Sequence, residues 1–301
     1  MTGRNVVVTG ATSGLGTACA RDLVQLGARL TLIARSQAKA EATCAQLVRD
    51  TPGAQVDYVL ADMGELAEVQ RAAMTLLSRY EKLDVLVHNA GALDSTYSAT
   101  REGTEQTIAT HVVGPYMLTS MLLPILSSAR PAEAVGAARI LWVSSGGMYA
   151  EPLDVDSLEM GPEGFDGVKA YAKAKRAQVT LSEMMAQAFA PAGLRVHAMH
   201  PGWADTPGIA RSLPTFRKLT RPLLRTPEQG ADTLVWLAAS DGQPLQETGK
   251  FWFDRTIRSI HKLAKTRKAD TPQARAALWN WVEDRASVCA PSLRPPVVSV
   301  T

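Results

Sequence analysis

The chain has 301 residues, of which 46% are hydrophobic and 20% charged, values typical of a globular protein with a sizeable core. The formal net charge of +3 is too small to indicate nucleic-acid binding by itself, so we expect no nucleic-acid partner. Cys19, Cys44 and Cys289 form neither a metal-ligand spacing nor an even set for disulfides. We therefore expect no metal site and a reducing, cytoplasmic location.

Runs rich in valine, leucine and isoleucine recur along the chain and predict buried strands. The expected strands are Asn5–Thr9, Arg29–Ala34, Gln55–Leu60, Leu83–His88, Arg139–Val143, Arg195–His200 and Gly249–Phe253. Helical periodicity lies between them, for example over 16–26 and 65–80. This alternation predicts a Rossmann-type doubly wound parallel α/β sheet with helices on both faces, in a single domain.

We place the α/β domain at residues 1–255 and a basic segment, a C-terminal helix and a tail at 256–301. Asp270 or Thr271 offers an N-cap and Pro272 suits a first turn, so a helix is expected over 273–286. The first expected strand begins at Asn5, which leaves no room for a signal peptide before it. The apolar stretch 116–126 is shorter than the roughly 20 residues that span a bilayer, so we expect a buried helix and no transmembrane segment.

A glycine-rich turn follows the first expected strand and has the layout of a dinucleotide phosphate site. Gly10 permits a sharp bend, Gly14 lets the backbone approach a pyrophosphate, and Gly16 lets the next helix pack close to the strand. The helix N-terminus would face the phosphates with its amides and its dipole. A glycine loop without a ligand is the alternative. Further contacts with the cofactor are expected from Thr12, Ser13 and Leu15.

Three later positions also lie where expected strands end. Arg35 follows the second strand, and the stretch from Arg29 to Lys39 contains no Asp or Glu. An acid at this place holds a ribose 2′-hydroxyl, whereas an arginine accommodates a 2′-phosphate, so we predict NADP(H) over NAD(H). A solvated surface arginine is the alternative. Five other cofactor contacts are expected after the third and fourth strands, with a plain turn as the alternative for the last three residues: Asp62, Met63, Asn89, Ala90 and Gly91.

Tyr171 and Lys175 are one helical turn apart, so both side chains point off the same face. Beside a nicotinamide they could move a proton while the cofactor moves a hydride. An ordinary amphipathic helix surface is the alternative.

Five motifs in this order resemble the short-chain dehydrogenases/reductases over residues 4 to 255. They are Thr9-Gly-x-x-x-Gly14-x-Gly16, Asn89-Ala-Gly91, Ser144-Ser145, Tyr171-x-x-x-Lys175 and Pro201-Gly202. The stretches 144–148 and 199–207 are most similar to one subgroup of that family. The resemblance implies an oxidoreductase that interconverts a carbonyl and an alcohol on a small, apolar molecule, and a homo-oligomer.

The resemblance also implies roles for individual residues. Tyr171 would be the general acid/base, and Lys175 would lower its pKa and hold the nicotinamide ribose. Ser145, with Ser144 as the alternative, would donate a hydrogen bond to the substrate oxygen. Three residues after the sixth strand would meet the cofactor: Pro201, Gly202 and Thr206. Residues 203–228 match the family's substrate lid, where Trp203, Leu213 and Phe216 would line an apolar pocket.

His111 stands where the family usually has a catalytic asparagine. A histidine could still serve a proton relay with a shifted pH profile, or it could have no catalytic part. This departure favours an alternative function, that of a non-catalytic NADP(H)-binding regulatory protein. Epimerisation or dehydration is a third option.

Basic residues recur in 205–228 and again in 255–268. A solvated charged face is the simplest interpretation. The sharper hypothesis is attraction to an acidic substrate or to anionic lipid headgroups, which would give peripheral contact with a membrane.

Overall fold

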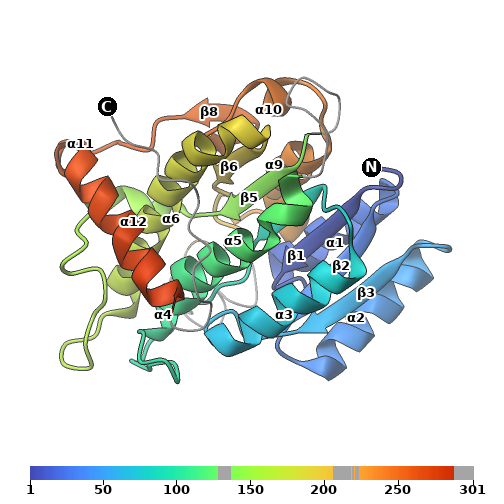
Figure 1. Ribbon diagram of the computed structural model, residues 1–301, viewed down its shortest axis with the longest axis horizontal. Coiled ribbons are helices and arrows are strands. Elements are labelled where there is room, and N and C mark those ends of the chain that lie inside the picture. Colours follow the sequence, from blue (N-terminus) through green and yellow to red (C-terminus); the bar gives the residue numbers. More distant parts are fainter. Residues whose placement is uncertain (128–136, 206–217, 219, 221–223, 288–301) are drawn as a thin grey trace.

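The computed structural model describes residues 1–127, 137–205, 218, 220 and 224–287. Within them, eight strands form one sheet in the order β3-β2-β1-β4-β5-β6-β7-β8, parallel except for the last pair (Figure 1). The strands are β1 (Asn5–Thr9), β2 (Arg29–Ala34), β3 (Val56–Leu60), β4 (Val85–His88), β5 (Arg139–Val143), β6 (Arg195–Met199), β7 (Lys250–Phe253) and β8 (Thr256–Arg258). The predicted doubly wound parallel sheet is confirmed.

Two layers of helices cover the sheet because neighbouring strand residues face opposite sides. Val6 and Val8 pack in one core with α1 (Gly14–Gln25), α2 (Gln37–Asp50) and α9 (Pro227–Ala239). Val7 packs in the other core with α3 (Leu66–Arg79), α5 (Gly114–Ser127) and α6 (Gly167–Phe189). Shorter helical segments are α4 (Gln106–Ile108), the π-helical turn η1 (Ala109–Val113), η2 (Gly146–Tyr149), η3 (Ala190–Ala192), α10 (Gln243–Gln246) and α11 (Ala264–Ala269).

The predicted C-terminal helix is confirmed as α12 (Pro272–Ala286), which lies beside α6 (Figure 1). The Thr271 hydroxyl caps it by accepting a hydrogen bond from Ala274 N at 3.1 Å. Leu278 and Val282 are fully buried in the core that α5 and α6 share. The ring of Trp279 meets that of Tyr116 edge-on at 5.6 Å. The helix therefore completes the core on the face that carries Tyr171 and Lys175.

Strand β8 was not expected from the sequence. Asp254 and Arg255, which connect it to β7, both have left-handed backbone conformations, with φ of 51° and 54°. Such two-residue hairpin turns favour Asn-Gly or Asp-Gly pairs, so Asp-Arg gives no clear turn signal. Arg255 is held in place by an ion pair with Asp232 on α9.

The apolar stretch expected to be a buried helix is α5, which continues α4 and η1 into 22 residues, Gln106–Ser127. Among the described helices it is long and apolar enough to cross a membrane by length and composition. However, 83% of its most apolar window is buried in the protein, as is typical of a core helix. Leu118 and Leu122, for example, are fully buried against the sheet.

Candidate active site

The glycine turn after β1 is shaped by close approaches of the backbone. Gly10 has φ of 67°, and a Cβ there would lie 2.7 Å from Ala90 Cα. A Cβ on Gly16 would clash with the Gly10 carbonyl and with the Asn89 side chain. Both positions therefore require glycine for this geometry, as the sequence predicted for the turn.

The Asn89-Ala-Gly91 segment ties the end of β4 to this turn. Asn89 Nδ2 donates to Thr9 O at 3.0 Å and to Gly10 O at 3.1 Å. The backbone amides of Asn89 and Ala90 donate to the Thr9 hydroxyl at 3.0 and 2.9 Å. Asn89 thus fixes the position of the glycine turn. The first turn of α1, which follows the glycine turn, lies at the edge of the sheet where β1 and β4 end.

The N-terminus of α1 is suited to phosphate. Ser13 is its N-cap residue, but its side chain makes no capping hydrogen bond, and the first turn of the helix contains no acid. The first amides of a helix are donors without intrahelical partners, and its dipole favours negative charge there. The residues present therefore fit the pyrophosphate of a dinucleotide.

Arg35 lies just after β2 with 65% of its side chain exposed. Its Nη1 is 3.3 Å from Asp62 Oδ2, which follows β3. Asp62 also accepts from Gly64 N, and its own amide donates to Glu68. The structure therefore brings Arg35 and Asp62 together at the edge of the sheet that carries the glycine turn. Met63 is buried, with its carbonyl packed against Gly114.

Ser145, Tyr171 and Lys175 come together where β5 and α6 meet. The Ser145 side chain lies near enough to the Tyr171 hydroxyl to lower its pKa. Lys175 Nζ lies 5.2 Å from the centre of the Tyr171 ring and donates to Val143 O at 2.9 Å. Ser144 is buried and donates to Lys175 O at 3.2 Å. The geometry thus favours Ser145 over Ser144 as the residue beside the tyrosine.

Burial controls the charge of this cluster. It raises the pKa of Tyr171 to about 12, against a smaller lowering by the nearby Ser145 side chain. It lowers the pKa of Lys175, which is 3% exposed, to about 7. Tyr171 is therefore protonated at neutral pH, and Lys175 exchanges its proton near neutrality.

His111 lies in the π-helical turn η1, at the other side of Tyr171. The two rings meet edge-on with their centres 5.3 Å apart. His111 Nε2 lies within hydrogen-bond distance of Ala92 O at 2.9 Å, and its ring packs against Gly91. Burial first, and then the charge of Lys175, lower the pKa of His111 well below its usual range. The ring is therefore neutral, and any relay through it would depend on hydrogen bonds rather than on charge.

Gln178 is a site residue that the sequence analysis missed. It lies on α6 two turns after Tyr171, and its Nε2 donates to His111 O at 2.7 Å. Its spacing of seven residues from Tyr171 places it on the same helix face, which was the available signal.

His200 was also missed as a single residue, although it precedes the Pro201-Gly202 motif. Its Nδ1 accepts from Gly146 N at 3.2 Å, and its ring stacks on Phe253 at 5.1 Å. It therefore holds the turn that follows Ser145. Gly202 has φ of 78° and packs against Arg225, which pairs with Asp254 at 2.8 Å.

Other predicted residues are placed less closely or lie elsewhere. Trp203 is 55% exposed beyond Pro201. Thr206, Leu213 and Phe216 lie outside the described residues. Within the described residues, no group of three acids, histidines or cysteines could hold a metal ion.

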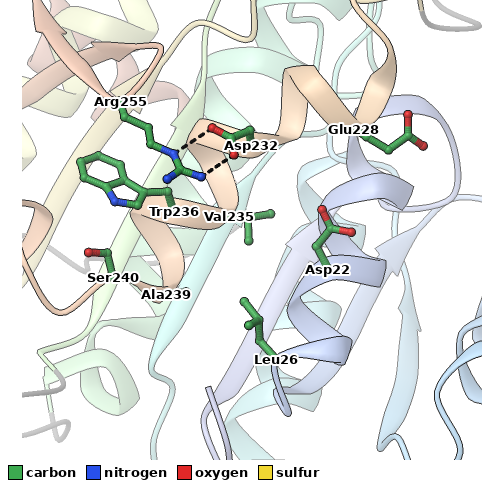
Figure 2. A pocket seen from close by; sticks show the side chains of 9 residues that line it. All are labelled: Asp22, Leu26, Glu228, Asp232, Val235, Trp236, Ala239, Ser240 and Arg255. Carbon is green, nitrogen blue, oxygen red and sulfur yellow. Dashed lines mark hydrogen bonds and ion pairs between the residues drawn. The ribbon is translucent and has the colours of Figure 1, made fainter.

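A separate groove of about 330 Å³ lies between α1 and α9 (Figure 2). Asp22 on α1 and Leu26 just after that helix line it, opposite Trp236 on α9. Figure 2 shows Arg255 reaching to Asp232 at its rim. The lining residues include none of Ser145, Tyr171 and Lys175, so this groove is not the reaction site.

Comparison with known proteins agrees with this geometry. A family model described as short chain dehydrogenase matches residues 4–215. Human dehydrogenase/reductase SDR family member 12 is 36% identical over 259 residues, covering 86% of this chain and 79% of that protein. Mouse retinol dehydrogenase 14 is 30% identical over 258 residues, covering 80% and 75%. The subgroup that residues 144–148 and 199–207 indicate is that of dehydrogenase/reductase SDR family member 12. The similarity to the human protein of that name confirms this resemblance.

Solved structures with bound cofactors share the fold. Pseudomonas aeruginosa RhlG, in an NADP active-site complex, is 25% identical with a TM-score of 0.67, covering 83% of this chain and 94% of that one. The 3-ketoacyl-(acyl-carrier-protein) reductase from Brucella melitensis, complexed with NADH, is 24% identical with a TM-score of 0.65, covering 83% and 96%. From its motifs, its sheet and these relatives, the chain belongs to the short-chain dehydrogenase/reductase family of oxidoreductases.

Proposed function

We propose that this protein is an NADP(H)-dependent oxidoreductase that interconverts a carbonyl and an alcohol, with Tyr171 as the general acid/base. The observation that carries the proposal is the cluster of Ser145, Tyr171 and Lys175. The Ser145 side chain lies near the Tyr171 hydroxyl, and the Lys175 ammonium lies 5.2 Å from the centre of the tyrosine ring. Both hydroxyl groups can donate to one substrate oxygen, which suits a carbonyl that gains negative charge.

The protonation of Tyr171 favours carbonyl reduction. NADPH, when bound, supplies a hydride to the carbonyl carbon. The electron pair of the C=O π bond then moves to the oxygen, and Tyr171 Oη donates the proton that completes the alcohol. Because burial raises the pKa of Tyr171 to about 12, the proton is in place at neutral pH. Lys175, when protonated, favours the phenolate that this step leaves behind.

Arg35 supports NADP(H) over NAD(H). Its guanidinium is largely exposed beside the end of β2, where it can meet a 2′-phosphate. Asp62 lies 3.3 Å from this guanidinium. A bound 2′-phosphate would either displace Asp62 from Arg35 or share the guanidinium with it. One relative is named retinol dehydrogenase 14, and one solved structure is an L-sorbose reductase complexed with NADPH and L-sorbose. These names support a small alcohol or carbonyl as the substrate. A cytoplasmic location and a homo-oligomer complete the proposal.

The test begins with titration of the purified protein with NADPH and NADH. Loss of NADPH absorbance is then followed with a panel of aldehydes and ketones, in wild type and in Tyr171→Phe. We expect NADPH to bind both proteins, and turnover to fall by about a thousandfold or more in the variant. Turnover that survives in Tyr171→Phe would contradict the assigned role.

A non-catalytic NADP(H)-binding regulatory protein is the second candidate function. The observation that favours it is the His111 carbonyl, which accepts a hydrogen bond from Gln178 in a site where the family asparagine is replaced. Tight NADPH binding without turnover across the panel would support this candidate. In that case, recovery of turnover by His111→Asn would assign the loss to this position.

A further inference from the structure

The segment after β8 is fastened to the turn that follows Ser145. Tyr149 on η2 donates its hydroxyl proton to Ser259 O at 2.8 Å. The buried Arg176 donates from one nitrogen, Nη2, to Met148 O at 2.7 Å and to Ile260 O at 2.9 Å. Residues 258–262 are therefore a fixed wall beside η2, which begins directly after Ser145.

Two cations on this wall, Arg258 and Lys262, lie beside η2. Lys262 Nζ lies 4.5 Å from the centre of the Tyr149 ring. After burial, the charges of Arg225 and Lys262 are the next causes that lower the pKa of His200, to about 4. Arg258 stands opposite Phe251 in the β7–β8 ladder, and the Phe251 ring meets that of Tyr149 edge-on at 6.2 Å. Lys262 and Arg258 thus raise the electrostatic potential at the side of the site formed by η2 and His200.

These two cations lack acidic partners, unlike their neighbours. Arg225 pairs with Asp254, and Arg255 pairs with Asp232. Asp270 is used by His261 and Arg275. Among the described residues, neither Arg258 nor Lys262 has an ion pair, and both are exposed. They are therefore free to meet an anion from solution.

We propose that Arg258 and Lys262 bind a carboxylate or phosphate group of the carbonyl substrate, remote from its reacting carbon. This inference rests on the proposed function and names its substrate class. Tyr149 lies four residues after Ser145 at the end of a 3₁₀ segment, which spans roughly 8 Å at about 2 Å per residue. A substrate with an apolar chain between its carbonyl and its anionic group could place the carbonyl at Ser145 and Tyr171 and the anion at Arg258 and Lys262. The orientation of these cations toward Tyr149 and His200 favours a substrate over a membrane surface.

The test uses an acid and its neutral twin, suberic semialdehyde and its methyl ester. Calorimetry measures their binding to the wild-type protein alone and to Tyr171→Phe saturated with NADPH, at low salt. We expect the acid to bind about tenfold more tightly than the ester in at least one of these forms. The preference should fall below about threefold in Lys262→Gln and in Arg258→Gln, and also at high salt. Lys268→Gln, an exposed lysine on α11, is the matched control and should keep the preference.

Equal affinity for acid and ester in both forms would overturn the inference. An equal loss in Lys268→Gln would also overturn it, because the effect would then come from general charge. Sedimentation with phosphatidylserine vesicles but not phosphatidylcholine vesicles, together with equal affinities, would assign the cations to a membrane surface instead.

Turnover separates this inference from the proposed function. If Tyr171-dependent reduction of both compounds occurs without preference for the acid, the anion site is wrong and the oxidoreductase stands. If the acid binds preferentially but neither compound is reduced, the anion site stands and the oxidoreductase loses support.

Discussion

The two halves of the site are held together by different means. The nucleotide half, at the ends of β1 and β4, depends on backbone approach, because Gly10 and Gly16 leave no room for a Cβ. The catalytic half, at the ends of β5 and β6, depends on side chains that reach across the fold. Arg176 joins Met148 to Ile260, and Gln178 holds His111.

This difference determines how each half responds to change. A half built from close backbone approach is intolerant of added atoms. A half held by long side chains can loosen without disturbing the glycine turn. Substitutions in one half should therefore leave the other half largely intact.

The largest effect is expected from Arg35→Asp in the nucleotide half. It removes the cation proposed for the 2′-phosphate and adds a repelling charge, beside Asp62. We expect the ratio of NADPH to NADH affinity to fall by about a hundredfold or more, measured by fluorescence titration. The matched control is Arg71→Asp, a similarly exposed arginine on α3. An unchanged ratio in Arg35→Asp would remove the basis for NADP(H) preference.

Gly16→Ala tests the claim that the nucleotide half tolerates no added atom. Alanine is the better helix former, so an open site would gain stability. Here the new methyl group would clash with Gly10 O and the Asn89 side chain. We expect a loss of about 1–3 kcal/mol in the free energy of unfolding, by denaturant titration, together with weaker NADPH binding. Gly161→Ala, which has open space around it, should change stability by less than about 0.5 kcal/mol.

The same difference explains what could be predicted from the sequence. The sheet, the glycine turn and the helix that carries Tyr171 and Lys175 are local patterns, and they were predicted with small errors at the ends of elements. The contacts of Arg176, Gln178 and His200 join segments up to 84 residues apart, which no local pattern reveals. Strand β8 was missed because Arg255 stands at the second position of its turn, where glycine is the usual residue in a left-handed conformation.

Arg176→Met sharpens the comparison from the catalytic side. It removes the donors to Met148 O and Ile260 O while keeping an unbranched chain in the core. We expect a loss of about 1–2 kcal/mol in stability, because carbonyls lose partners while a buried cation is also removed. Hydrogen exchange should speed up at residues 146–149 and 259–262 and stay unchanged at 10–16. Faster exchange at both places would show that the two halves are not separate.

Lys175→Met has the smallest expected effect on the folded protein, and its sign depends on pH. Burial lowers the pKa of Lys175 to about 7, whereas the unfolded chain has a lysine pKa of about 10.4. Between these values the unfolded chain binds more protons, so this residue makes stability rise with pH across that window. Below pH 7 the folded protein carries the full cost of a buried charge.

Methionine removes that cost but also the hydrogen bond to Val143 O, so we expect a net gain of about 1 kcal/mol at pH 6, or a melting temperature about 2–4 °C higher. The gain should shrink as pH rises toward 10 and should be absent in Lys169→Met, where the lysine is exposed on the same helix. Thermal unfolding of the cofactor-free proteins at several pH values measures this. A gain that does not vary with pH would mean that Lys175 is not destabilised by its charge. The pH-dependent gain would instead show that the catalytic half keeps a buried lysine at the expense of stability, as expected of a residue retained for chemistry.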